Sequence, residues 1–71
     1  MSEPLPILVE NVLQIAWDIL ERSGEIDDPY EASYFLAKTV ARLARKGEQR
    51  RLMLINCAID AYRQHRRAVA A

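Results

Sequence analysis

Cysteine, histidine, glycine and proline are all scarce in this 71-residue chain. The single cysteine, Cys57, excludes an intrachain disulfide and gives no sign of an oxidising compartment. Cys57 and His65 are the only thiol and imidazole side chains, too few for the usual four-ligand zinc site. The chain also lacks a glycine-rich phosphate loop. We therefore expect a protein that uses no metal and no cofactor.

Long hydrophobic runs are missing as well. No stretch approaches the roughly 20 uncharged apolar residues that a membrane span needs. The first six residues contain neither the basic segment nor the small-residue cleavage site of a secretory signal. These absences predict a cytoplasmic protein that does not cross a membrane.

What the chain does contain favours helices, because alanine, leucine, isoleucine and arginine are plentiful while helix breakers are few. A domain of this size buries only about 60% of its unfolded surface. A single core of this size rarely supplies more than roughly 3–5 kcal/mol. Additional stabilisation is therefore common in small domains, and self-association is the form that this sequence leaves open.

Helix start and stop signals divide the chain into three segments. Gly24 and Gly47 each follow an apolar-periodic segment, as C-terminal helix caps do. Asp28, Pro29 and Glu31 form a helix start signal with a capping residue, a first-turn proline and a capping-box acid.

These signals predict helices at about 6–23, 29–46 and 49–67, with fraying from Ala68 onward. Short connections favour antiparallel neighbours. We predict an all-α antiparallel three-helix bundle that forms a single domain over residues 1–71.

Apolar residues on the first two predicted helices exceed what one neighbour would cover. On the first helix they span an arc of roughly 200°, whereas packing against one neighbour needs about 100°. The third helix has an ordinary stripe, made of Leu52, Ile55, Ala58, Ile59 and Tyr62. A contiguous exposed apolar patch marks an interface. We predict a homodimer whose candidate interface residues are Leu13, Trp17, Leu20 and Phe35, and the monomer is the alternative.

Charge is divided unevenly although the formal net charge is zero. Residues 1–36 carry eight acids and one base, a net charge of −7, and residues 37–71 carry nine bases and two acids, a net charge of +7. Such asymmetry can indicate a basic binding face. It can also mean that the acidic part of the chain lies against the basic part in the fold, which we favour.

Basic residues concentrate around Gly47, between the second and third predicted helices. The candidate nucleic-acid contacts there are Arg42, Arg45, Lys46, Arg50 and Arg51. The arrangement is similar to a helix-turn-helix, but the second helix is long for that motif and the whole-chain charge is zero. The alternative is a solvated corner, in which the cations of the last turn complement the helix dipole.

Catalytic groups are poorly placed in the sequence. Cys57 and His65 are eight residues apart on one predicted helix, about 12 Å along its axis. That separation is beyond the reach of a nucleophile and its base. We therefore do not expect an enzyme.

Two sequence runs resemble short uncharacterised bacterial proteins, chiefly α-proteobacterial. The first runs from Ser23 to Pro29 and the second from Arg45 to Tyr62. This resemblance implies a bacterial origin and carries no activity, ligand or functional residue.

The function that the sequence favours is a small non-enzymatic interaction or adaptor module that self-associates through the apolar surface of its first two helices. The alternative is a nucleic-acid-binding regulator that uses the basic corner. Salt separates these two hypotheses, because phosphate binding weakens steeply with salt and an apolar seam does not.

Overall fold

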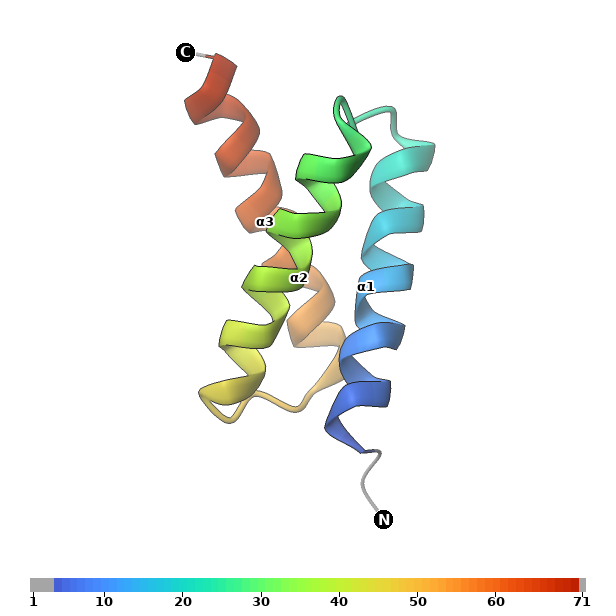
Figure 1. The fold of residues 1–71 in the computed structure, drawn as a ribbon, viewed down its shortest axis with the longest axis vertical. Helices are drawn as coiled ribbons and strands as arrows, with labels where there is room; N and C mark the ends of the chain where they lie inside the picture. The colour runs from blue at the N-terminus through green and yellow to red at the C-terminus, as the bar shows by residue number, and fades with distance from the viewer. Residues whose placement is uncertain (1–3, 71) are drawn as a thin grey trace.

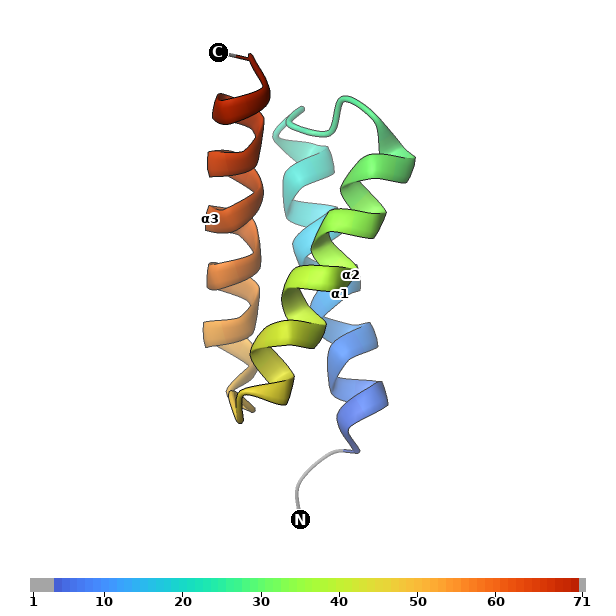
Figure 2. The ribbon, with the colours of Figure 1, turned by 60° about the vertical axis from the view of Figure 1, so that its left-hand side comes forward.

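The computed structural model describes residues 4–70, which form three helices: α1 (Leu5–Arg22), α2 (Pro29–Arg45) and α3 (Arg51–Ala70) (Figure 1). Consecutive helices run in opposite directions, and each helix packs against the other two (Figure 2). The predicted all-α antiparallel three-helix bundle is confirmed. The molecule measures 42 × 22 × 18 Å.

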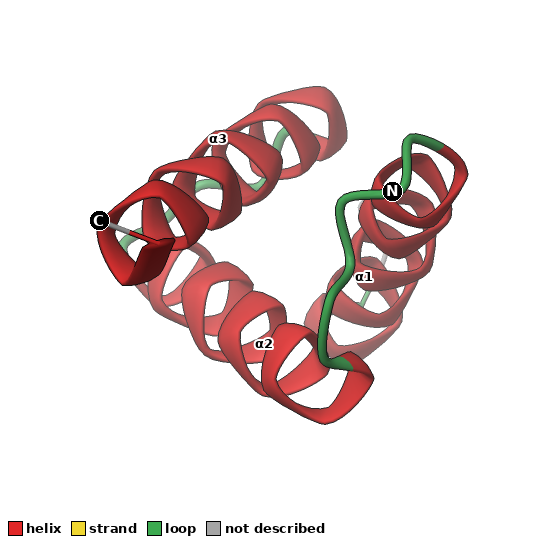
Figure 3. Ribbon diagram, turned by 90° about the horizontal axis from the view of Figure 1, so that it is seen from above, coloured by secondary structure: helices red, strands yellow, loops and turns green. Residues whose placement is uncertain are grey.

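Seen along the bundle, the helices lie at the corners of a triangle, and the α1–α2 connection crosses one end (Figure 3). Each helix therefore has two neighbours and an outer face. The surface available to a partner consists of these outer faces and the seams between helix pairs.

The helix bounds differ from the predicted ones at several ends. α1 begins one residue before the predicted start, and α3 begins at Arg51 instead of residue 49. α3 continues through Ala70, three residues beyond its predicted end, while Ala71 lies outside the described residues, and the fraying expected from Ala68 onward stays a prediction. Fraying was expected from the position near the chain end, whereas alanine and arginine are strong helix formers.

Both glycines end a helix in the same way. Gly24 has φ +73° and Gly47 has φ +101°, in the left-handed region that a side chain disfavours. After α1, the amide of Gly24 donates to Glu21 and the amide of Glu25 to Leu20. This pair of hydrogen bonds is a Schellman motif, and it directs the Glu25 side chain toward α3.

The same motif follows α2, where Gly47 donates to Ala44 and Glu48 donates to Leu43. Glu48 then accepts a hydrogen bond from the backbone amide of Arg50 at 3.2 Å. These bonds hold residues 47–50 in a non-helical connection, which is why α3 begins two residues later than predicted.

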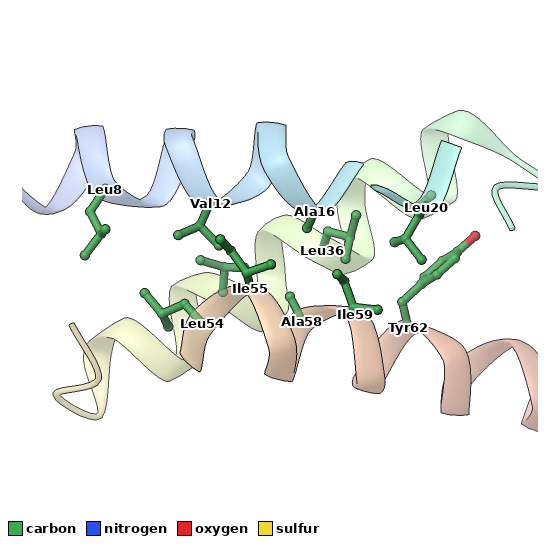
Figure 4. Close-up of a cluster of buried hydrophobic side chains, with 12 residues drawn as sticks. Leu8, Val12, Ala16, Leu20, Leu36, Leu54, Ile55, Ala58, Ile59 and Tyr62 are labelled. Carbon is green, nitrogen blue, oxygen red and sulfur yellow. The ribbon is translucent and has the colours of Figure 1, made fainter. Parts of the chain in front are cut away.

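The core is a column of apolar side chains that runs the length of the bundle (Figure 4). α1 contributes Leu8, Val12, Ala16 and Leu20, and α2 contributes Ala32, Leu36 and Val40. α3 contributes Leu54, Ile55, Ala58, Ile59 and Tyr62.

Leu52 was predicted to belong to the α3 stripe, and this is wrong because its side chain is 73% exposed. Leu54, Ala58 and Tyr62 are spaced four residues apart and centre the buried face instead. Leu52 lies about 120° around the helix from Ala58, at the edge of the first turn.

Candidate interaction surface

The four predicted interface residues occupy three different environments. Leu13 and Trp17 are half-buried on the α1 side of the α1–α2 seam. Leu20 is completely buried in the core, so the prediction that it contributes to an interface is wrong. Phe35 lies on the opposite side of α2, in the seam with α3.

The correction for Leu20 has a simple cause. Leu20 is four residues beyond Ala16, in line with Leu8 and Val12, and this line faces both neighbouring helices. The wide apolar arc of α1 therefore divides into a buried half and a half that faces the seam with α2.

Two apolar recesses follow that seam. The first, of about 420 Å³, lies between the N-terminal half of α1 and the C-terminal half of α2. Its lining is mostly aliphatic and includes Leu5, Pro6, Val9, Leu13, Ala41 and Ala44.

The second recess, of about 180 Å³, is lined by Leu13, Gln14, Trp17, Ser33 and Leu36. Leu13 borders both recesses. The two recesses therefore lie next to each other along the seam, and we call them together the α1–α2 groove.

Trp17 lines the α1–α2 groove, and its indole nitrogen is hydrogen-bonded to a residue that does not line the groove. The indole Nε1–H donates to Glu21 Oε2 at 2.7 Å, one turn along α1. A tryptophan whose nitrogen is already bonded can pack its ring against an apolar partner without leaving a donor unsatisfied.

Phe35 belongs to an aromatic cluster that joins α2 to α3. Its ring stacks on His65, with centroids 4.4 Å apart and planes at 22°, and lies 5.9 Å from the Tyr62 ring. His65 Nε2 is 2.9 Å from Glu31 Oε1. Phe35 therefore packs against residues of α3 in the α2–α3 seam. The expectation that it shares one patch with Trp17 is wrong.

The acidic α1–α2 connection is paired with the C-terminal half of α3. Arg63 Nε donates to Glu25 Oε1 at 2.9 Å, and Arg66 Nε donates to Asp27 Oδ2 at 3.0 Å. The hydrogen bond from Arg63, helped by Ser23, lowers the pKa of Glu25 to about 2. The charge asymmetry of the sequence is therefore partly neutralised within the fold, as we favoured.

The five predicted nucleic-acid contacts are separated by the structure. Arg50 closes a local ion pair with Glu48 at 2.9 Å, which lowers the pKa of Glu48 and raises that of Arg50. Arg51 opens α3 and is exposed.

The other three predicted contacts, Arg42, Arg45 and Lys46, line a recess of about 490 Å³ together with Lys38 and Ala41. Within residues 4–70, no carboxylate pairs with these four cations. We call these four side chains the α2 cation cluster. Arg45 also borders the α1–α2 groove.

Lys38 was not predicted to join the cations around Gly47, although its spacing of four residues from Arg42 could have shown it. The contact of His65 with Phe35 and Glu31 was also not predicted. No sequence signal marked that contact, because it joins side chains 30 residues apart and more.

Neither a metal site nor a membrane-spanning helix is found in the part of the chain that the structure describes. Within residues 4–70, no group of three or more histidine, cysteine, aspartate or glutamate side chains could hold a metal ion. The helices of that part of the chain are also too short or too polar to span a membrane.

Comparisons of this chain with models of protein families, with curated protein sequences and with solved structures found no match. The resemblance to α-proteobacterial proteins therefore stays a prediction.

Proposed function

We propose that the protein is a small, non-enzymatic helical interaction module that self-associates through the α1–α2 groove. The observation that carries the proposal is that two apolar recesses lie side by side along this seam and share Leu13. A contiguous exposed apolar surface is characteristic of an interface.

The size of the molecule supports the same proposal. A 71-residue chain has room for one modest core. Covering the groove with a second copy would remove further apolar surface from water, at about 25 cal/mol per Å². Self-association would therefore supply stability that the isolated bundle cannot generate.

The proposal that the module is not an enzyme is supported by the positions of its reactive groups. Cys57 and His65 are two turns apart on α3. His65 faces Phe35 and Glu31. We also propose that the module acts in the cytoplasm, since its one cysteine precludes an intrachain disulfide. The proposal that the cytoplasm is that of a bacterium rests on the resemblance of the two sequence runs alone.

Sedimentation equilibrium of two matched leucine variants tests the self-association proposal. Leu13→Ala should raise the dimer Kd roughly thirtyfold or more, because a truncated interface anchor costs about 1 kcal/mol or more and occurs twice in a symmetric dimer. Leu52→Ala removes the same atoms from an exposed position on α3 and should leave Kd unchanged.

Circular dichroism of each variant checks that the helices are intact. A wild type that sediments as a monomer up to millimolar concentration would refute self-association. Equal effects of the two substitutions would show that the α1–α2 groove is not the interface.

A second candidate function, nucleic-acid binding, is favoured by one observation. The α2 cation cluster has no carboxylate partner among residues 4–70, and unpaired cations on one helix face attract phosphates. Amide chemical shifts recorded while mixed DNA or RNA is added would move at residues 38–46 at low salt and return at high salt. Unchanged shifts at low salt would dismiss this candidate.

A further inference from the structure

The two helices that form the α1–α2 groove carry opposite charges. α1 contains three acids and one base, a net charge of −2, and α2 contains one acid and three bases, a net charge of +2. The bases of α2 all lie in its C-terminal half, at Lys38, Arg42 and Arg45. A surface made of these two helices is therefore acidic on one side and basic on the other.

Glu10 and Arg45 line the same recess of the groove, Glu10 from α1 and Arg45 from α2. Glu10 is exposed on α1, and among residues 4–70 it forms no ion pair. Each copy thus presents, in one recess and on opposite sides of the groove, a carboxylate and a guanidinium that have no ion-pair partner among residues 4–70.

Shape divides in the same way as charge. In the larger recess, the apolar lining from α1 includes Leu5, Val9 and Leu13, whereas the apolar lining from α2 consists of Ala41 and Ala44. Large side chains of one helix pack best against small ones of another, because helix spacing depends on the side chains at the contact.

We propose that a second copy of the chain occupies the groove, related by a two-fold axis parallel to the helices, so that α1 of each copy lies on α2 of the other. This inference rests on the proposed function and specifies its partner and orientation. The resulting interface consists of four helices, α1 and α2 of each copy, and the helices that face each other across it are antiparallel.

The geometry of this axis produces the complementarity. A two-fold rotation about an axis parallel to the helices keeps every residue at its height and exchanges the α1 side with the α2 side. Glu10 of one copy then meets the Ala41–Arg45 stretch of the other, and the aliphatic side of α1 meets the alanines. Each of these contacts occurs twice.

The other symmetric arrangement has the opposite result. An axis across the helices would lay α1 on α1 and α2 on α2, so that each acidic helix faces an acidic helix and each basic helix faces a basic one. Like charges across an interface disfavour association. Charge and side-chain size thus select the same orientation.

Charge reversal at Glu10 and Arg45 tests the orientation. Glu10→Lys and Arg45→Glu should each raise the homodimer Kd about tenfold at low salt, since each turns two attractive contacts into two repulsive ones. A one-to-one mixture of the two variants should form heterodimers with a Kd within about threefold of the wild type. In that heterodimer, both contacts between position 10 of one copy and position 45 of the other again join opposite charges.

Two control variants carry the same charge changes on α3. Asp60→Lys matches Glu10→Lys, and Arg67→Glu matches Arg45→Glu, and both lie on exposed positions outside the groove. Neither should change the homodimer Kd. Circular dichroism establishes that all four variants fold.

Each result separates the orientation from self-association itself. A dimeric wild type whose Kd is unaffected by Glu10→Lys would overturn the proposed orientation and leave the groove as the interface. A mixture that stays as weak as the single variants would also overturn it, because positions 10 and 45 would then not meet across the interface. A monomeric wild type whose residues 38–46 respond to oligonucleotides would refute both proposals.

Discussion

Asp28 shows at the scale of one residue how the sequence starts a helix. Its carboxylate Oδ1 accepts hydrogen bonds from the amides of Tyr30 at 3.0 Å and Glu31 at 3.4 Å, and Pro29 follows it as the first helical residue. Asp28→Ala should lower the free energy of unfolding by about 1 kcal/mol, because two amides of the first turn lose their acceptor.

Urea denaturation measures this loss, and Asp28→Asn is the matched control. The side-chain amide oxygen that this substitution introduces can accept the same hydrogen bonds, so the variant should retain most of the stability. A loss as large in Asp28→Asn as in Asp28→Ala would show that charge, and not capping, is the contribution of Asp28.

At the scale of elements, the ion pairs of Glu25 connect the α1–α2 connection to α3. The pKa of Glu25 falls from 4.5 to about 2 because Arg63 and Ser23 stabilise its carboxylate. A carboxyl group with a lowered pKa contributes stability that is complete above its unfolded pKa and is lost as the pH falls through the folded value. That window runs from about pH 4.5 to about pH 2.

Thermal unfolding of wild type and Glu25→Gln across this window tests the connection. The variant should be less stable at pH 6, and the difference should shrink toward pH 2, where the wild-type carboxylate is also neutralised. The effect should be small and reduced by salt, because the Arg63 side chain is 44% exposed. A difference that does not depend on pH would assign the loss to packing.

At the scale of the whole molecule, folding and self-association should be linked. A dimer that binds only folded chains makes the thermal midpoint rise with protein concentration. We expect the midpoint of the wild type to rise by several degrees between micromolar and millimolar protein, given that small domains gain roughly 4–8 °C per kcal/mol. Trp17→Ala should reduce this dependence.

Differential scanning calorimetry over a concentration series measures the dependence, and Leu52→Ala is again the control outside the groove. A wild-type midpoint that does not depend on concentration would contradict the linkage. A Trp17→Ala midpoint that is lower but equally dependent on concentration would place Trp17 in the fold alone.

The sequence by itself determined the number of helices and the connections between them. Gly24, Asp28 and Gly47 act through their own backbone angles and neighbouring amides, so their effects are readable without a partner element. The apolar periodicity of α1 and α2 then follows from the 3.6-residue turn, and with short connections it leaves few alternatives to an antiparallel bundle.

Only the tertiary structure decided which apolar side chains remain for a partner. Leu20 and Trp17 belong to the same wide apolar arc of α1, but Leu20 is buried and Trp17 is only half-buried. The difference arises because α3 covers one side of the arc and the seam with α2 follows the other. Phe35 does not belong to that surface, because its ring stacks on His65, which is 30 residues away in the chain.

The tertiary structure also decided which charges are neutralised. Glu48 forms an ion pair with Arg50, one of the cations around Gly47. Glu25 and Asp27 pair with cations of α3 that lie about 40 residues away in the sequence. The α2 cation cluster stays without a carboxylate among residues 4–70 because no acidic segment is folded over it. Helix boundaries depend on neighbouring residues, so they can be predicted from the sequence. Which side chains remain exposed depends on contacts between segments that are distant in the chain, and the sequence pattern does not contain these contacts.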